Sequence, residues 1–294
     1  MRIPAWFCDA YAPAEVPLLA RLGITRARLL RMGLVTQHEA ELVDPALLQG
    51  LHDADYLDAF LHGLAPQASR QGIAWTPRVR DASLAMLGGQ LQAARHALEH
   101  GIAMNIARGF HHAHPATGSG FCALNGLALL AHVMPQRRIM VIDCDEHGGD
   151  GTEAFAARLP NLYAISIFGT RFGCRGGVRS WAYQIHPEQG FSRYLEVLEE
   201  VAGLIEAHRP DLLVYQAGVD CHRDDPKSRV KLTSGELFRR DLTVFGMAQR
   251  SGVPILFVLA GGYQVAEKVA RLNANTVRAA RIAWRRQAGS DAKT

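Results

Sequence analysis

Five short apolar runs that alternate with helical patterns constrain this chain more than any other feature of its sequence. Each run is nearly continuous in apolar residues, as expected for strands that are buried on both faces of a sheet. The runs lie at 102–107, 138–143, 162–168, 211–217 and 254–260. The helical patterns lie at 84–99, 122–134, 192–208, 235–250 and 265–284. This alternation implies right-handed crossovers and predicts an α/β fold with a mostly parallel, multi-stranded sheet flanked by helices.

The other segments are predicted to belong to the same fold. Residues 2–8 are expected to form a further strand, 14–62 several short helices, and 63–83 a surface loop. No internal repeat and no linker rich in Pro, Gly or Ser divides the chain. We therefore predict a single domain over residues 1–294.

Composition excludes several classes of protein. Hydrophobic residues make up 48% of the 294 and charged residues 20%, which supplies a large core and excludes general disorder. The net charge of +4 is too mild to indicate nucleic acid or a membrane surface as a partner. No apolar run approaches the roughly 20 residues of a membrane span, and the first residues lack the apolar segment of a secretion signal.

Cysteine usage indicates a reducing compartment. The five cysteines are odd in number, widely spaced and without a CxxC pair, which argues against a disulfide framework and against a cysteine zinc site. They are Cys8, Cys122, Cys144, Cys174 and Cys221. We therefore expect a cytoplasmic protein.

Polar residues follow four of the predicted strands at the point where each strand ends. In open α/β sheets, ligands bind beyond the carboxyl ends of the strands. The polar segments lie at 109–114, 143–151, 218–220 and 261–263. Four such strand ends together predict a functional site at that edge of the sheet.

Asp145 and His147 form an Asp-x-His motif that can hold a metal ion. Alternate residues of an extended segment project the same way, so both side chains can reach one ion. Asp220, from another strand end, is the candidate third ligand. Three N/O ligands with an open position are typical of catalytic zinc, and the lack of cysteine ligands also allows ferrous iron. Taken alone, the motif is more often a hydrogen-bonded pair in a loop.

His111 and His112 are candidates for general acid–base catalysis. Histidines in that role are usually oriented by a carboxylate on the other ring nitrogen, and Asp143 and Asp150 could serve. The alternative is a solvated loop. We interpret the nearby His114 as such a loop residue.

Two glycine-rich turns complete the set of candidates. Gly261 and Gly262 would let the backbone approach a ligand and would present the phenol of Tyr263, which can stabilise an oxyanion. The segment 118–122 lacks the spacing of a phosphate-binding loop, and we interpret it as a tight turn that presents Phe121 to a pocket.

In this order and spacing the motifs resemble the histone deacetylase superfamily, which includes acetylpolyamine amidohydrolases. The resemblance covers residues 84–284, and the stretch 220–233 is most similar to the bacterial class IV-like branch. The matching motifs are His111-His112, Gly120-Phe121-Cys122, the segment from Asp143 through Asp145, His147 and Asp150 to Thr152, Gly218-Val219-Asp220, and Gly262-Tyr263.

The resemblance implies hydrolysis of an N-acyl amide, such as acetyl-lysine or a small acetylated amine, to acetate and a free amine. It implies that Asp145, His147 and Asp220 hold zinc. Backbone groups of Asp143, Asp145 and His147, together with Ser166, match a structural monovalent-cation site that would take K⁺.

The resemblance also implies roles for the remaining residues. His111, oriented by Asp143, and His112, oriented by Asp150, would handle protons, and Tyr263 would hold the carbonyl oxygen against the metal. Substrate-binding positions, with the two phenylalanines as the walls of a narrow channel, would be Gly120, Phe121, Phe172, Gly261 and Gly262.

The sequence departs from the family pattern around the mouth of the expected pocket. Phe168 stands where a histidine is usual, 173–174 replaces a turn that contains proline, and 9–34 matches poorly, with 11–17 in place of the usual entrance segment. Gly148 stands where relatives often have His or Gln, but no ligand is expected there. Substrate preference is therefore left open.

Two other functions compete with the amidohydrolase. A binuclear manganese ureohydrolase shares the architecture but needs further bridging carboxylates, as in Asp-x-His-x-Asp and Asp-x-Asp. Here Gly149 stands at the last position of the first motif, and Cys221-His222 follows Asp220. A non-catalytic protein that binds acylated amines on the same fold is the other alternative. The presence of every residue expected for the chemistry argues against it.

Overall fold

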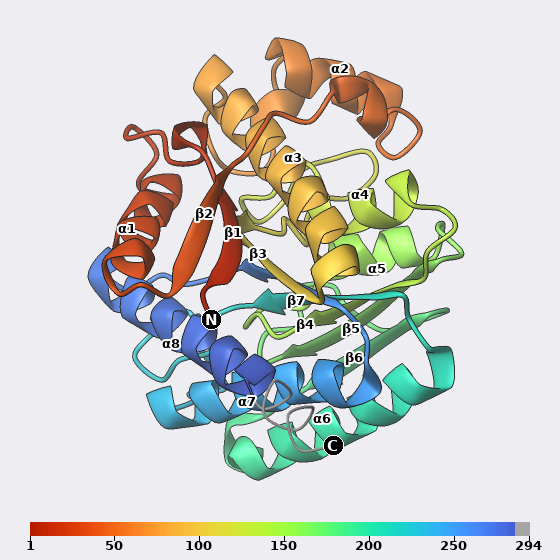
Figure 1. Ribbon diagram of the computed structural model, residues 1–294. Helices are drawn as coiled ribbons and strands as arrows, with labels where there is room; N and C mark the ends of the chain where they lie inside the picture. Colours follow the sequence, from red (N-terminus) through yellow and green to blue (C-terminus); the bar gives the residue numbers. More distant parts are fainter. Residues whose placement is uncertain (286–294) are drawn as a thin grey trace.

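Eight strands form one sheet in the computed structural model, in the order β2-β1-β3-β8-β7-β4-β5-β6, and every neighbouring pair is parallel (Figure 1). The structure describes residues 1–285; residues 286–294 of the predicted domain lie outside the described residues. The strands are β1 (Ile3–Phe7), β2 (Val35–Glu39), β3 (Ile102–Arg108), β4 (Ile139–Asp143), β5 (Leu162–Phe168), β6 (Ser180–Gln184), β7 (Leu212–Ala217) and β8 (Ile255–Leu259). The predicted parallel α/β sheet is confirmed.

Helices cover both faces of the sheet. They are α1 (Pro17–Arg31), α2 (Ala54–His62), α3 (Pro77–His100), α4 (Gly126–Val133), α5 (Asp150–Ala156), α6 (Gly190–His208), α7 (Ser234–Ser251) and α8 (Ala266–Arg285). Helices α3, α4 and α5 pack along one face, and α1, α8, α7 and α6 pack along the other (Figure 1). Short 3₁₀ helices lie at Asp9–Tyr11, Pro45–Leu48, Gln67–Ser69 and Pro187–Gln189.

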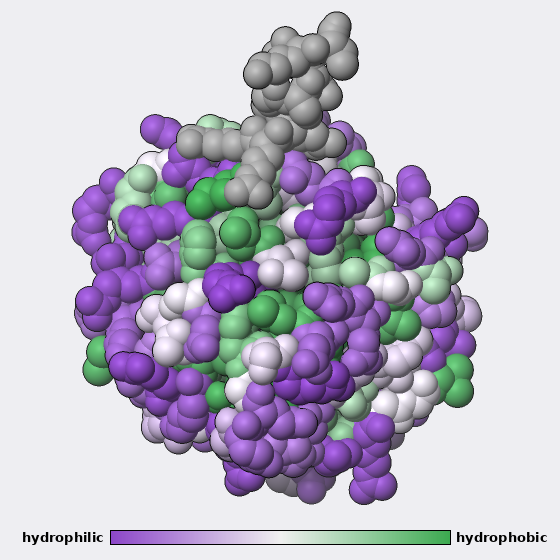
Figure 2. All heavy atoms as spheres, turned by 90° about the horizontal axis from the view of Figure 1, so that it is seen from below, coloured by the Kyte–Doolittle hydropathy of each residue, from purple (hydrophilic) through white to green (hydrophobic). Residues whose placement is uncertain are grey.

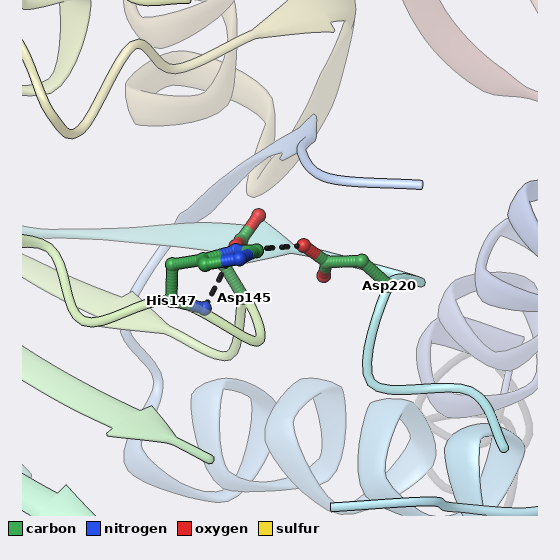
Figure 3. A group of neighbouring side chains, drawn as sticks. All are labelled: Asp145, His147 and Asp220. Carbon is green, nitrogen blue, oxygen red and sulfur yellow. Dashed lines mark hydrogen bonds and ion pairs between the residues drawn. The ribbon is translucent and has the colours of Figure 1, made fainter. Parts of the chain in front are cut away.

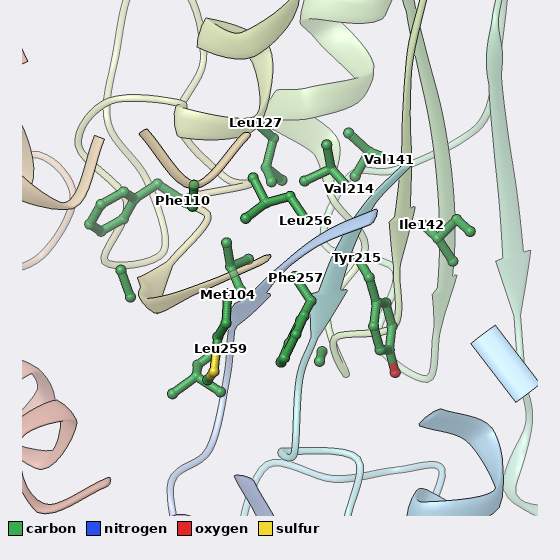
Figure 4. Close-up of a cluster of buried hydrophobic side chains, with 14 of the residues drawn as sticks. Met104, Phe110, Leu127, Val141, Ile142, Val214, Tyr215, Leu256, Phe257 and Leu259 are labelled. Atoms are coloured by element: carbon green, nitrogen blue, oxygen red, sulfur yellow. The ribbon is translucent and has the colours of Figure 1, made fainter. Parts of the chain in front are cut away.

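The central strands are buried on both faces. Val214 pairs with Leu256 across β7 and β8, and the two side chains point towards Leu127 of α4 (Figure 4). The next pair along the strands, Tyr215 and Phe257, points to the opposite face (Figure 4). All five side chains are fully buried. Burial on two faces explains why these strands appear in the sequence as continuous apolar runs.

The outer surface over α6, α7 and α8 is mostly hydrophilic, with apolar residues gathered along its middle (Figure 2). Ile282 of α8 is one of the exposed apolar side chains of this region, at 40% exposure. Within residues 1–285, no helix combines the length and the apolar character that a membrane-spanning segment needs.

Two strands and one helix were not predicted from the sequence. Strands β2 and β6 are the edges of the sheet and are largely half-buried or exposed, so their sequences VTQHE and SWAYQ contain no apolar run. The expectation of only short helices over 14–62 is therefore wrong at β2. Helix α5 has only 7 residues, which is too short for a helical period to be evident.

The predicted surface loop over 63–83 is also partly wrong. Helix α3 begins at Pro77, with Thr76 as its N-cap; the Thr76 hydroxyl accepts a hydrogen bond of 3.2 Å from the Val79 amide. Proline is favoured at the first position of a helix because its missing N–H needs no partner there. The proline that suggested a loop in fact starts the helix.

Candidate active site

Asp145, His147 and Asp220 meet beyond the carboxyl ends of β4 and β7 (Figure 3). The two strands are neighbours in the sheet, with Asp143 in register with Gln216, and this brings the segments that follow them together. Nδ1 of His147 lies 3.1 Å from Oδ1 of Asp145 and 3.2 Å from Oδ2 of Asp220. Among residues 1–285, this is the one group of three His, Cys, Asp or Glu side chains close enough to share a metal ion.

The surroundings of the three ligands suit a divalent cation. Oδ2 of Asp220 is buried with Nδ1 of His147 as its neighbour, and Oδ1 accepts a hydrogen bond of 3.0 Å from the Glu146 amide. The Gly261 amide donates to Oδ2 of Asp145 at 2.6 Å, and a Cβ on Gly261 would lie 1.9 Å from Oδ2 of Asp220. Two buried carboxylates that share one imidazole repel each other, and a bound divalent cation would neutralise them.

The three ligands perturb one another's protonation. Burial, followed by the charge of Asp145, raises the pKa of Asp220 to about 7. Burial opposes protonation of His147, but its two carboxylate neighbours outweigh burial and raise its pKa to about 10. A divalent cation would compete with these protons, because it needs the neutral imidazole and both carboxylates.

Two buried histidines lie beside this cluster, each on its own carboxylate. Nδ1 of His111 is 2.7 Å from Oδ2 of Asp143, and Nδ1 of His112 is 2.6 Å from Oδ1 of Asp150. The two rings are 3.9 Å apart between centroids, and each histidine is 4% exposed. Both contacts leave Nε2 as the ring nitrogen that is available for chemistry.

The environment pushes the pKa values of the two histidines in opposite directions. Burial works against protonation of His111, but Asp143 and Asp145 outweigh it and raise its pKa. Burial, reinforced by the charge of His111, lowers the pKa of His112 to about 3 despite the presence of Asp150. Two titratable groups separated in this way can act as a proton donor and a proton acceptor.

His114 belongs to the same network, and its interpretation as a loop residue missed this. Nε2 of His114 lies 2.8 Å from Oδ2 of Asp150, so one carboxylate contacts two imidazoles. Burial opposes ionisation of Asp150, but the two histidines lower its pKa to about 2. The sequence signal was the spacing His112-x-His114, which keeps two imidazoles within reach of one carboxylate.

Tyr263 reaches the cluster from the end of β8. Its ring lies 6.1 Å from the His147 ring, and its amide donates a hydrogen bond of 2.7 Å to Oδ2 of Asp225. Burial raises the pKa of the Tyr263 hydroxyl. A Cβ on Gly262 would lie 2.9 Å from Cγ2 of Val219, so the turn before Tyr263 tolerates no larger residue without movement.

Phe121 and Phe172 lie near the catalytic candidates, and both adopt left-handed backbone conformations with φ of 65° and 47°. The Phe172 ring is 3.9 Å from that of His112, and the Phe121 ring is 6.5 Å from that of Tyr263. Gly120 has φ of 49°, and a Cβ there would lie 2.3 Å from Cδ2 of His112. Phe172 is 40% exposed, so it borders the solvent side of the site.

A buried arginine, Arg240, contacts the residues next to Asp145 and Asp220. The sequence did not indicate this contact. Nη1 of Arg240 donates to the carbonyl of Cys144 at 3.0 Å and to Sγ of Cys221 at 2.9 Å. Cys144 directly precedes Asp145, and Cys221 directly follows Asp220. The other side of the guanidinium pairs with Asp241 at 2.8 Å.

Known proteins resemble this chain in sequence and in fold. A family model described as the histone deacetylase domain matches residues 18–280. An uncharacterized protein of Picosynechococcus sp. is 35% identical over 239 residues, which cover 77% of this chain and 78% of that protein. Histone deacetylase 2 of Arabidopsis thaliana is 31% identical over 187 residues, 60% of this chain and 48% of that protein.

A solved structure shares the fold. The crystal structure of an acetylpolyamine aminohydrolase from Burkholderia pseudomallei superposes with a TM-score of 0.79 at 20% sequence identity. The superposition covers 96% of this chain and 99% of that one. At this identity the likeness shows the fold alone.

Proposed function

The chain belongs to the histone deacetylase domain family and is a hydrolase of the deacetylase type, and from this premise we propose that it is a metal-dependent amidohydrolase. Its substrate is an N-acetylated amine, such as acetyl-lysine or a small acetylated amine, and its products are acetate and the free amine. Asp145, His147 and Asp220 hold zinc, or ferrous iron in its place.

The observation that carries this proposal is the cluster of two buried carboxylates and one imidazole, whose ligand atoms all lie within 4.8 Å of one another. Two carboxylates and an imidazole are a donor set that zinc accepts in catalytic sites, where one position stays open for water. When bound there, the ion would act as a Lewis acid and bring the pKa of its water to about 7.

The histidine pair handles the protons of the reaction. Asp150 holds Nδ1 of His112, and the low pKa of this ring keeps Nε2 unprotonated and able to accept a proton from water. Asp143 and the raised pKa of His111 favour the protonated form of that ring, which stabilises negative charge and supplies a proton for the leaving amine. These assignments follow from the opposite pKa shifts of two rings in contact.

Tyr263 stabilises the oxyanion. Its raised pKa keeps the phenol protonated, so that the hydroxyl donates a hydrogen bond to the carbonyl oxygen as negative charge develops. Phe121 and Phe172 bind the alkyl part of the substrate between them. The other substrate-binding positions, Gly120, Gly261 and Gly262, let His112, Asp220 and Val219 approach the backbone closely. The K⁺ site at Asp143, Asp145, His147 and Ser166 stays a prediction, as does a cytoplasmic location.

Metal content and hydrolysis of a fluorogenic acetyl-lysine amide test the proposal together. We expect about one zinc or iron per chain, and a loss of about 10²–10³-fold in kcat for Tyr263→Phe with unchanged metal content. Tyr163→Phe is the matched control, because the Tyr163 ring lies 4.8 Å from that of His208, outside the cluster. Two manganese ions per chain would support the ureohydrolase alternative, and bound metal without any turnover would support a binding protein.

A further inference from the structure

Arg108 is a buried cation without a partner. It is the last residue of β3 and is only 4% exposed. Its Nη1 is enclosed and makes no hydrogen bond, and within residues 1–285 no other nitrogen of this guanidinium has a hydrogen bond or an ion pair. A guanidinium carries five N–H donors, and burying it without an acceptor is costly. Such a group marks a place where the protein receives an anion.

Arg21 brings a second buried guanidinium to the same place. It lies on α1, is 6% exposed, and donates one hydrogen bond of 3.2 Å to the carbonyl of Ala260. Ala260 directly precedes Gly261, which contacts the carboxylates of Asp145 and Asp220. Cζ of Arg21 lies 5.6 Å from the centroid of the Tyr263 ring. The arginine is therefore next to the group that faces the scissile carbonyl in the proposed mechanism.

The two guanidiniums are close enough to repel each other. Burial, followed by the charge of Arg108, lowers the pKa of Arg21 to about 10. Asp145 and Asp220 are near both arginines, but neither forms an ion pair with them, and a bound divalent cation would neutralise them. A second anion is then needed to balance the arginines.

We propose that Arg108 and Arg21 bind a carboxylate that belongs to the acyl group of the substrate. This inference rests on the proposed function and specifies its substrate class: amines acylated by a short dicarboxylic acid, such as malonyl-, succinyl- or glutaryl-lysine. Water adds to the amide carbon, the C–N bond breaks, and the amine leaves with a proton while the acid is released as a dicarboxylate. No other reactant is needed.

Three peptides that differ only in the acyl group on one lysine separate the effect of the carboxylate from the effect of acyl length. Succinyl-lysine carries the carboxylate, succinamoyl-lysine replaces it by a neutral amide of the same length, and acetyl-lysine lacks it. With the metal-loaded enzyme we expect kcat/KM for succinyl to exceed that for succinamoyl by at least about tenfold, since hydrogen bonds between charged groups are the strong ones. In Arg108→Met this ratio falls to within about threefold of unity. Arg95→Met, an exposed arginine of α3, is the control and keeps the wild-type ratio.

Binding measurements keep the test decisive if a variant folds poorly. Calorimetric titration of the metal-loaded wild type with succinate and with acetate needs no variant, and Arg108→Lys retains the charge without the planar guanidinium. Carboxylate binding that weakens at least about tenfold in Arg108→Lys or Arg108→Met supports the pocket. If acetate shows this loss and succinyl-lysine is not hydrolysed, the carboxylate is that of the product.

The two proposals fail in different ways. Hydrolysis of acetyl-lysine with no preference for succinyl over succinamoyl, and carboxylate binding equal in wild type and Arg108→Met, would overturn the carboxylate pocket and leave the amidohydrolase intact. Absence of hydrolysis for all three peptides would overturn the amidohydrolase. Arg108-dependent binding of succinate would still support the pocket in that case.

Discussion

Nε2 of His114 lies 2.8 Å from Oδ2 of Asp150, the carboxylate oxygen that His112 does not contact. The side chain of His114 is 32% exposed, whereas that of His112 is 5% exposed. One carboxylate therefore joins a buried imidazole to an imidazole at the surface. By occupying the second oxygen, His114 fixes the orientation in which Asp150 meets His112.

Removing His114 tests this positioning. We expect His114→Ala to lower kcat by about tenfold with little change in KM, because residues that orient a site typically matter at this level. His114→Gln, which keeps a hydrogen-bond donor, restores most of the activity. The pH profile of kcat should also shift in His114→Ala and not in His62→Gln, an exposed histidine control. Equal kcat and identical pH profiles for all variants would show that His114 has no such role.

Arg240 bonds to Asp241 and to the segments that carry Asp145 and Asp220. Its replacement should therefore destabilise the fold. We expect Arg240→Met to lower the free energy of unfolding by about 3–5 kcal/mol, because it leaves the buried carboxylate of Asp241 without a cation, with only the hydroxyls of Tyr215 and Thr276 as partners. Urea unfolding followed by circular dichroism measures this. Arg239→Met, an exposed neighbour on α7, should change the free energy by less than about 0.5 kcal/mol. A loss below about 1 kcal/mol for Arg240→Met would contradict the prediction.

His52 makes the stability of the fold sensitive to acid. Its Nδ1 lies 3.1 Å from the carbonyl of His114 and 3.3 Å from that of Pro115, and its Nε2 accepts from the Asn125 amide at 3.1 Å. This arrangement fits the neutral ring alone, since a second N–H would face the Asn125 N–H. Burial lowers the pKa of His52 to about 4.

The sign of the effect follows from proton binding. Between about pH 6.5 and pH 4 the unfolded chain binds a proton on His52 and the folded chain does not, so stability falls as the pH falls. The contribution is at most about 3 kcal/mol. We expect His52→Gln to be less stable than wild type at pH 7 but to lose less stability between pH 6.5 and pH 4, as measured by urea unfolding at several pH values. Parallel pH curves for the two proteins would exclude His52 as the source.

Removal of the metal should lower the stability of the fold, and this effect should require Asp220. We expect chelation to reduce the melting temperature of the wild type and re-addition of zinc to restore it, because an ion that binds the folded state stabilises it by mass action. Asp220→Asn should lose both the bound metal and this response. Asp58→Asn, an exposed carboxylate of α2, is the control. A response to zinc that persists in Asp220→Asn would place the metal elsewhere.

The sequence by itself determined the central sheet and the motifs at its edge. The strand predicted at 162–168 coincides with β5, since burial on both faces demands a continuous apolar run that is visible locally. The pairing of Asp145 with His147 is equally local, since their spacing alone places them on one side of the chain. The edge strands β2 and β6 were not predicted, because strands exposed on one side have no continuous apolar run.

Only the tertiary structure decided which distant residues share a site. Asp220 meets His147 because β7 lies beside β4 in the sheet, and no feature of either segment specifies that order. The same holds for Arg108 and Arg21. In the sequence they are a strand-end arginine and a helix arginine, but packing buries both and places Arg21 beside Tyr263. Local patterns determine whether a segment is buried, but the partners of a buried charge depend on segments that are far apart in the chain.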